Sequence, residues 1–188
     1  MIKGFSNNKP NKLITLPRPM IKFIQTLDLK ELVGAEIGVL NGENARSILE
    51  TLDIKNLFLI DPYLDHKEYL EIKGPIFAVL MKRAKLLLEE FNYKITWIRK
   101  RSSEAVEDVP EELDFIYIDG NHTYKNSLED IKNYWPKIKK GGIIGGHDYY
   151  NKNEALEVKK AVDEFVEENN LKLNFIREGP LCDWWIVK

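Results

Sequence analysis

The chain has 188 residues, of which 44% are hydrophobic and 31% are charged, and these values fit one globular domain with a sizeable core. Its 28 Lys and Arg residues against 30 Asp and Glu residues leave a formal net charge of -2. Electrostatics therefore gives no reason to expect nucleic acid or an anionic membrane as a partner.

The N-terminal residues 1–19 contain Pro10, Pro17 and Pro19 and predict a loose arm that leads into a short helix over residues 20–29. Residues 1–12 are polar and lack the apolar centre of a secretory signal. No apolar run approaches the roughly 20 residues that span a bilayer. Cys182 is the single cysteine, which excludes an intrachain disulfide and is typical of a reducing compartment. We expect a cytoplasmic protein.

Strand-like and helix-like segments alternate after residue 29. Apolar runs predict strands over residues 33–39, 56–60, 94–99, 113–118 and 141–146. Helical spacing or caps predict helices over residues 43–52, 76–91, 104–108 and 155–169. A further helix is predicted in the segment that ends at Pro136. Two short strands, residues 172–176 and 184–187, follow the last helix.

Strands that are apolar throughout are typical of a sheet covered on both faces. Five such strands separated by helices predict a doubly wound parallel sheet. The last two strands are joined by a short link, which predicts an antiparallel hairpin at the C-terminus. We therefore expect one α/β domain over residues 1–188, with a mostly parallel seven-stranded sheet.

In such a sheet, ligands bind at the carboxyl ends of the strands. The first predicted strand is followed by Glu36-Ile-Gly38-Val-Leu-Asn-Gly42, and both glycines let the backbone turn and approach a ligand. The alternative is a simple turn from strand to helix. The spacing is not G-x-G-x-x-G, which weakens a dinucleotide-binding interpretation.

Polar residues also follow the second and third predicted strands. Asp61 ends the second strand, where a ribose diol needs an acceptor, but Asp61-Pro62 could equally stop the strand. Ser102-Ser103-Glu104 follows the third strand, and Ser103 could lie near an adenine or cap the next helix.

The fourth and fifth strands end in the most informative residues. Asp119-Gly-Asn-His122 follows one strand, and His147-Asp148-Tyr149 follows the other. Because neighbouring strands lie about 4.8 Å apart, carboxylates at their ends can share a cation such as Mg²⁺, and a histidine would admit Mn²⁺. The alternatives are a loop acid at Asp148 and a hydrogen-bonded core histidine at His147.

Together these residues resemble the class I S-adenosylmethionine-dependent methyltransferases. The resemblance is carried by Glu36-x-Gly38-x-x-x-Gly42, the acid Asp61 and the run from Asp119 to Tyr124. More narrowly, the helix with Asp130 and Trp135 and the run from Lys139 to Tyr149 are similar to the small metal-dependent O-methyltransferases that act on sugars and natural products. The similarity extends from about Glu36 to Trp184-Trp185 and implies a Rossmann-like fold.

The resemblance implies a role for each matched residue. Glu36, Gly38 and Gly42 would surround the methionine part of S-adenosylmethionine, Asp61 would hold the ribose, and Ser103 would lie near the adenine. Asp119, also beside the cofactor, would bind a divalent metal (Mg²⁺ or Mn²⁺) with Asp148. Where relatives commonly have two consecutive acids, this sequence has His147-Asp148, which makes His147 a further candidate ligand.

The resemblance implies metal-assisted methylation of a hydroxyl on a small acceptor. From the charge balance we expect no nucleic acid or membrane partner, and a homo-oligomer is left open. Metal coordination would lower the pKa of the acceptor hydroxyl, and His122, His147 or Asp119 could take its proton. Two alternatives remain: an NAD-dependent oxidoreductase with an atypical glycine loop, and a cofactor-binding module without catalysis.

Overall fold

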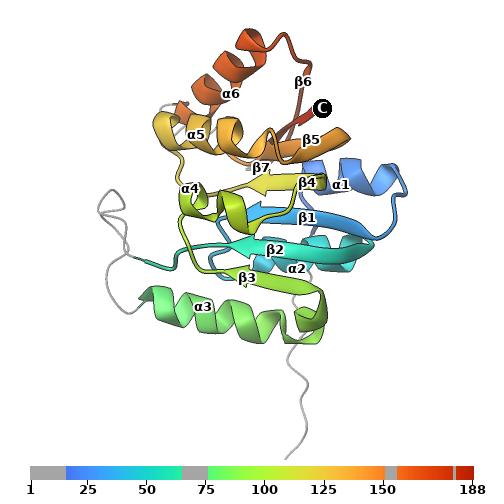
Figure 1. Cartoon of the computed structure of the whole chain (residues 1–188), viewed down its shortest axis with the longest axis vertical. Coiled ribbons are helices and arrows are strands. Elements are labelled where there is room, and N and C mark those ends of the chain that lie inside the picture. The colour runs from blue at the N-terminus through green and yellow to red at the C-terminus, as the bar shows by residue number, and fades with distance from the viewer. Residues whose placement is uncertain (1–15, 65–75, 151–155, 180) are drawn as a thin grey trace, which may run out of the picture.

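Seven strands form one mixed sheet in the computed structural model, which describes residues 16–64, 76–150, 156–179 and 181–188. Their order is β3-β2-β1-β4-β5-β7-β6 (Figure 1). The strands are β1 (Leu32–Ile37), β2 (Ile54–Ile60), β3 (Ile95–Ile98), β4 (Leu113–Ile118), β5 (Ile138–Gly146), β6 (Leu173–Glu178) and β7 (Leu181–Val187).

The first five strands are parallel, and β7 runs antiparallel to both β5 and β6. This confirms the predicted α/β fold with a C-terminal antiparallel hairpin. The carboxyl ends of β1, β2 and β4 meet on the left of Figure 1, so the residues that follow these strands gather at one edge of the sheet.

Helices cover both faces of the sheet. They are α1 (Pro19–Thr26), α2 (Glu43–Thr51), α3 (Ile76–Leu87), α4 (Ser102–Ala105), α5 (Tyr124–Tyr134) and α6 (Glu157–Glu168). In Figure 1, α4 and α5 lie in front of the sheet and α2 lies behind it. None of the helices in the described ranges is long and apolar enough to cross a bilayer.

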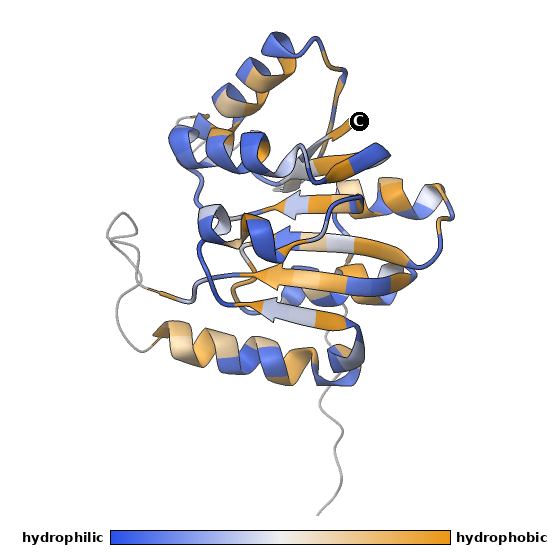
Figure 2. Cartoon of the chain, viewed as in Figure 1, coloured by the Kyte–Doolittle hydropathy of each residue, from blue (hydrophilic) through white to orange (hydrophobic). Residues whose placement is uncertain are grey.

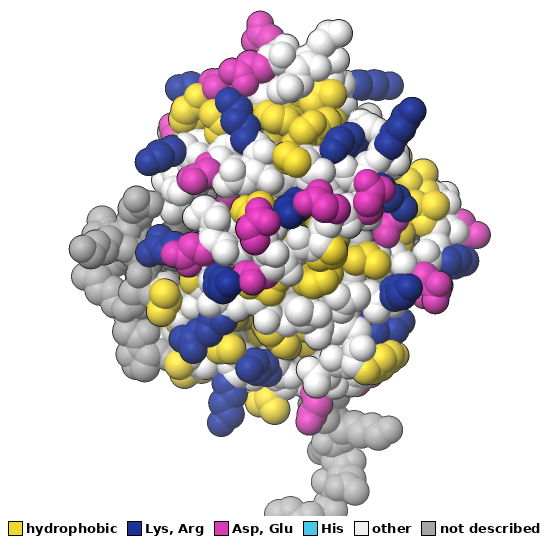
Figure 3. Space-filling view, in the orientation of Figure 1, with side chains coloured by type: hydrophobic (Ala, Val, Ile, Leu, Met, Phe, Trp, Pro, Cys, Tyr) yellow, Lys and Arg dark blue, Asp and Glu magenta, His cyan; other side chains and the backbone are white. Residues whose placement is uncertain are grey.

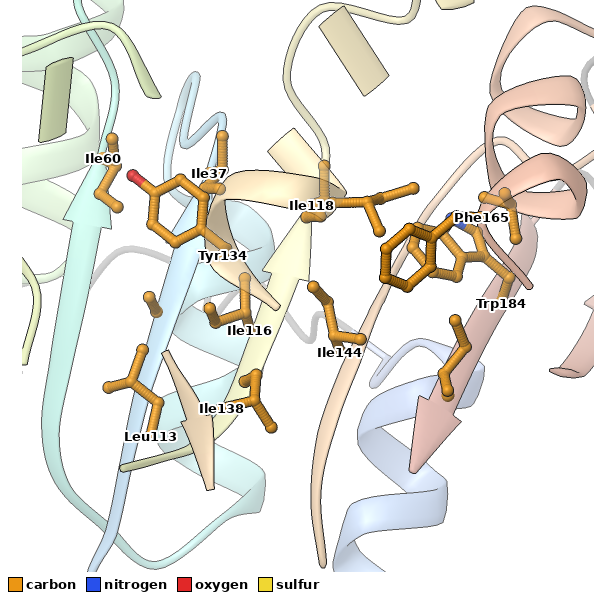
Figure 4. Packing of buried hydrophobic residues seen from close by; sticks show 14 of the residues in the cluster. Ile37, Ile60, Leu113, Ile116, Ile118, Tyr134, Ile138, Ile144, Phe165 and Trp184 are labelled. Atoms are coloured by element: carbon orange, nitrogen blue, oxygen red, sulfur yellow. The ribbon is translucent and has the colours of Figure 1, made fainter. Parts of the chain in front are cut away.

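Two hydrophobic clusters explain why the strands are apolar throughout. Ile116 and Ile118 of β4 belong to the cluster under α5 and α6, whereas Phe115 and Tyr117 belong to the cluster with α1 and α2. Figure 4 shows part of the first cluster, with Ile116, Ile118 and Ile144 on neighbouring strands. Figure 2 shows the resulting hydrophobic strands beneath helices whose outer faces are hydrophilic.

Several predicted boundaries shift. The helix predicted over residues 76–91 ends at Leu87 and continues as a 3₁₀ segment, Glu89–Lys94. The strand predicted from residue 141 begins at Ile138, which pairs with Leu113. The short helix after β3 begins at Ser102 with Arg101 as its N-cap, so the predicted serine cap is wrong. Residues 1–15 of the predicted arm lie outside the described residues.

Candidate functional site

A cavity of about 820 Å³ opens at the carboxyl ends of β1, β2 and β4, where sheets of this kind bind their ligands. Its volume suits a small organic molecule. Six residues predicted from the sequence line it: Glu36, Gly38, Asp61, Ser103, Asp119 and His122. Gly42, His147 and Asp148 are not among the described residues of its lining.

Gly38 and Gly42 both adopt the left-handed backbone conformation, with φ of 86° and 82°. A Cβ atom on Gly38 would lie 2.0 Å from the carbonyl oxygen of Asp119, so glycine is what lets the ends of β1 and β4 approach each other. Gly42 is the N-cap of α2, and a Cβ there would meet Ala84 of α3 at 3.2 Å. Gly42 thus turns the chain and lies close to α3, and its place beside the methionine part of the cofactor stays a prediction.

The Asp61 carboxylate accepts hydrogen bonds from backbone amides of two segments, the loop after β1 and the residues that follow β2. Its Oδ2 accepts hydrogen bonds from the amides of Val39 and Leu40, each at 3.0 Å, and its Oδ1 accepts one from Tyr63 at 2.7 Å. The side chain therefore ties the glycine loop to the end of β2. Carboxylate oxygens accept more than one hydrogen bond, so the same oxygens can also accept from a ligand hydroxyl.

Glu36 is a buried carboxyl group on β1, only 1% exposed. Asn44 donates to its Oε1 at 2.8 Å, while its Oε2 has no hydrogen-bond partner among the described residues. Burial raises the pKa of Glu36 to about 8, although the Asn44 hydrogen bond and the Arg18 charge oppose the increase. A buried oxygen without a donor is costly unless a ligand supplies one.

Arg18 enters the site from the segment before α1, which the sequence did not single out. Its Nη1 donates to Asp119 Oδ2 at 2.7 Å and to the Tyr117 hydroxyl at 3.0 Å. The guanidinium carbon lies 5.5 Å from the centroid of the Tyr117 ring, within the range of a cation–π contact. Arg18 also lines the cavity.

Asp119, His122 and Asp148 form a cluster that could hold a metal, since each offers one ligand atom and all three atoms lie within 4.8 Å of one another. His122 Nε2 is 3.4 Å from Asp119 Oδ1 and 3.3 Å from Asp148 Oδ2. Burial alone would raise the pKa of Asp119, but the His122 hydrogen bond and the Arg18 charge lower it to about 2. Asp119 is therefore ionised at neutral pH.

Two features of this cluster were not expected. Arg18 and His122 already lie against Asp119, so the two carboxylates do not depend on a metal alone to offset their repulsion. Asp148 adopts a positive φ of 60°, a region that is sparsely populated for residues other than glycine. Such backbone is kept only where its surroundings impose it, and it concentrates at functional sites.

His147 lies beside the cluster with its ring turned toward β7. Its Nδ1 is 3.4 Å from Asp183 Oδ1 and 3.4 Å from the carbonyl oxygen of Cys182, and its Nε2 is 3.9 Å from Asp148 Oδ1. Burial lowers the pKa of His147, but the hydrogen bond with Asp183 and the charges of Asp119 and Asp148 together outweigh it, and the net shift is upward. The group of possible ligands within 4.8 Å contains His122 in place of His147.

A family model described as a methyltransferase domain matches residues 35–149, which include Glu36, Asp61 and the whole Asp119–His122–Asp148 cluster. The chain belongs to this methyltransferase family. The match confirms the resemblance found in the sequence and favours methyl transfer over the NAD-dependent alternative.

Solved methyltransferase structures share the fold of this chain. An O-methyltransferase from Bacillus cereus, in complex with SAH (S-adenosylhomocysteine), is 15% identical, with a TM-score of 0.65 over 95% of this chain and 85% of that one. An rRNA methylase from Streptococcus thermophilus is 13% identical, with a TM-score of 0.64 over 93% of this chain and 99% of that one. At these identities the similarity establishes the fold alone.

A curated relative extends the comparison to sequence. An uncharacterized protein, R132, from Acanthamoeba polyphaga mimivirus is 28% identical over 148 residues, which are 76% of this chain. The match spans 63% of the length of that relative, so the activity and partners of this methyltransferase are proposals.

Three polar residues in or beside the candidate site were missed as functional candidates. They are Arg18, the buried Asp183, and Asp130, which lines the cavity. Burial raises the pKa of Asp130 to about 7, although a hydrogen bond with Ser102 opposes the shift. The one available signal was Asp130 within its helix, because nothing in local spacing connects Arg18 with Asp119, 101 positions away, or Asp183 with His147 of another strand end.

Proposed function

We propose that this methyltransferase transfers the methyl group of S-adenosylmethionine to a hydroxyl oxygen of a small acceptor, such as a sugar or natural product, with assistance from a divalent cation. One observation carries the proposal: a buried carboxyl group and a glycine turn line one cavity together with Asp119 and His122, two members of an Asp–His–Asp cluster, in a chain of the methyltransferase family.

The donor set of the cavity fits the cofactor. Glu36 Oε2 is a buried acceptor without a donor, which suits the ammonium of the methionine part, and Asp61 can accept from the ribose. Ser103 is an exposed residue of α4 that lines the cavity, and we assign it to the adenine. S-adenosylmethionine, when bound, supplies a methyl group on an electrophilic sulfonium. The protein contributes by aligning that group with the acceptor oxygen.

The Asp119, His122 and Asp148 cluster also fits a divalent cation. Two carboxylate oxygens and one imidazole nitrogen form a mixed set, and imidazole favours transition ions over Mg²⁺. We therefore favour Mn²⁺, which would lower the pKa of a bound acceptor hydroxyl. His147, whose Nε2 lies 3.9 Å from Asp148, stays the alternative ligand candidate, and as a ligand it would not be the proton acceptor.

We propose His147 as the proton acceptor in the case where His122 would be a metal ligand. Asp183 and the Cys182 carbonyl both face His147 Nδ1, and because both are acceptors they favour the tautomer that carries its proton there. His147 Nε2 is then the basic atom. Without a metal, His122 takes this role between the two aspartates.

The remaining expectations concern partners and compartment. Acidic and basic side chains are interspersed on the face shown in Figure 3, which supports a small-molecule acceptor over nucleic acid or a membrane surface. We retain the cytoplasm as the proposed compartment and homo-oligomerisation as compatible with this chemistry.

Formation of S-adenosylhomocysteine tests the activity. We would incubate the protein with S-adenosylmethionine, Mn²⁺ and a panel of sugars, catechols and other hydroxylated small molecules, and measure the demethylated product. Asp119→Asn should lower the rate by at least about a hundredfold, by analogy with the loss of a catalytic electrostatic group. Asp108→Asn, on the surface beside Lys100, is the matched control. Cofactor binding without turnover of any acceptor would favour the non-catalytic module.

A chelator experiment tests metal assistance separately. Activity should disappear in EDTA and return with Mn²⁺ more fully than with Mg²⁺, and His122→Ala should abolish Mn²⁺ binding in calorimetry. His147→Ala should retain Mn²⁺ and lose turnover. Full activity in EDTA would contradict the metal proposal and leave His122 as the proton acceptor.

A further inference from the structure

Positive charge is scarce around the cavity. Among the described residues that line it, Arg18 and Arg101 are the only Lys or Arg side chains. Acidic side chains are more numerous: Glu36, Glu43, Asp61, Asp119, Glu129 and Asp130. A ligand with an anionic group therefore has few places in this cavity where that group meets a cation.

Only one nitrogen atom of the Arg18 guanidinium, Nη1, donates hydrogen bonds to the described residues. Its Nη1 makes both contacts, to Asp119 and to the Tyr117 hydroxyl. No described residue accepts a hydrogen bond from its Nε or Nη2, and the side chain is 22% exposed. A guanidinium presents its donors as a planar fork that matches a carboxylate.

The fold fixes the position of Arg18 in advance. Arg18 is the N-cap of α1, and the amide of Met20 in the first turn donates to the buried Asp183 Oδ2 at 3.0 Å. Further along α1, the Phe23 ring stacks on Trp185 of β7 with centroids 5.0 Å apart. These contacts hold the start of α1 against the sheet, so the guanidinium requires little ordering when a ligand binds.

The methionine part of S-adenosylmethionine carries an ammonium and a carboxylate on one carbon atom. Glu36 Oε2 offers a buried acceptor for the ammonium, and Arg18 lines the same cavity as Glu36. We propose that Arg18 binds the carboxylate of the methionine part of the cofactor, so that Arg18 and Glu36 together recognise this zwitterion. The inference rests on the function proposed above.

Two ligands that differ by one group test this role. S-adenosylhomocysteine has the carboxylate, and its decarboxylated analogue keeps the amine, sulfur, ribose and adenine. Calorimetry should show that Arg18→Met lowers the affinity for S-adenosylhomocysteine by about 10- to 100-fold, the usual effect of losing a charge-assisted hydrogen bond. Affinity for the decarboxylated analogue should stay within about twofold of wild type. Arg18→Lys should restore part of the lost affinity.

Arg101→Met is the matched control, because it removes the other cation of the lining and should affect both ligands alike. Equal loss of both ligands in Arg18→Met would overturn the proposal, since Arg18 would then act only as a structural partner of Asp119. Unchanged binding of S-adenosylhomocysteine in Arg18→Met would also overturn it, with the proposed function intact. Failure of the wild-type protein to bind either ligand would overturn both.

Discussion

The two halves of the cavity rim use the same residue type differently. At the end of β2, the Asp61 carboxylate accepts three backbone amides and holds the loop after β1. At the ends of β4 and β5, Asp119 and Asp148 face His122 instead. In the sequence all three acids read alike, as an aspartate after an apolar strand. Their hydrogen-bond and ion-pair partners distinguish Asp61, which holds the backbone of the cavity, from Asp119 and Asp148, which lie against a titratable side chain.

The difference follows from which backbone groups the chain leaves exposed. The loop after β1 turns at Gly38 and presents amide groups toward β2 that need an acceptor. The segment after β4 turns away toward α5, where the Thr123 side chain accepts from the amide of Asn126. The amide of Tyr124 in the same turn donates to Glu157 of α6, so the start of α5 has acceptors other than Asp119, whose carboxylate lies against the side chains of Arg18 and His122.

The largest effect on this comparison should come from Gly38, where the two halves meet. Gly38→Ala should destabilise the protein by about 3–5 kcal/mol, because a Cβ would lie 2.0 Å from the Asp119 carbonyl oxygen at a positive φ. Gly141→Ala is the control, since its φ is 80° but no atom lies within 4 Å of the added Cβ. It should lose only about 1 kcal/mol of unfolding free energy in urea. Similar losses in both variants would mean that β1 and β4 can separate without cost.

The pattern of apolar runs was enough to predict the sheet. The fourth strand was predicted at residues 113–118, where β4 lies, because its side chains are buried on both faces and no alternation blurs its ends. The end of α3 at Leu87 was missed. Leu88 is buried and is followed by the exposed Glu89 and Glu90, a pattern that also fits a continuing amphipathic helix. There, tertiary packing and not helical spacing decides where the helix stops.

The site was predicted in position but not in detail. Strand ends locate Asp119 and Asp148, because topology alone brings them to one edge. The contact of Arg18 with Asp119 joins residues 101 positions apart and depends on how α1 docks on β7. The close approach of His122, and not of His147, to both aspartates likewise goes with a long-range contact, that of His147 Nδ1 with Asp183. No local spacing encodes either contact.

A matched pair of substitutions sharpens the contrast between the two kinds of aspartate. Asp61→Asn should cost about 1–3 kcal/mol of unfolding free energy, because an amide NH₂ would face backbone amides that need an acceptor. Asp148→Asn should cost less than about 0.5 kcal/mol, since asparagine tolerates the positive φ of residue 148. Urea unfolding measures both values. If Asp148→Asn is the more damaging substitution, the cluster is structural and the contrast fails.

The smallest expected effect is the loss of the Glu36 proton when a ligand binds. Glu36 lies on β1, at one side of the cavity rim. Its pKa of about 8 means that the free protein holds this proton at neutral pH. An ammonium placed beside Oε2 would favour the carboxylate and lower the pKa, so binding of S-adenosylhomocysteine should release a proton. The bound state then carries fewer protons than the free state, and affinity should rise with pH up to about 8, by at most about tenfold per pH unit.

Calorimetry at pH 7 in two buffers of different ionisation enthalpy measures this release directly. The apparent binding enthalpy of the wild-type protein should differ between the two buffers. For each proton released, the difference equals the difference between the ionisation enthalpies of the buffers, and up to one proton is expected. Glu36→Gln has no proton to release and should remove the difference while binding more weakly. An analogue without the amine should also remove it in the wild-type protein, because no ammonium then approaches Oε2. Equal enthalpies in both buffers for the wild type would mean that Glu36 keeps its proton in the complex, and the ammonium would then have to be bound elsewhere on the rim.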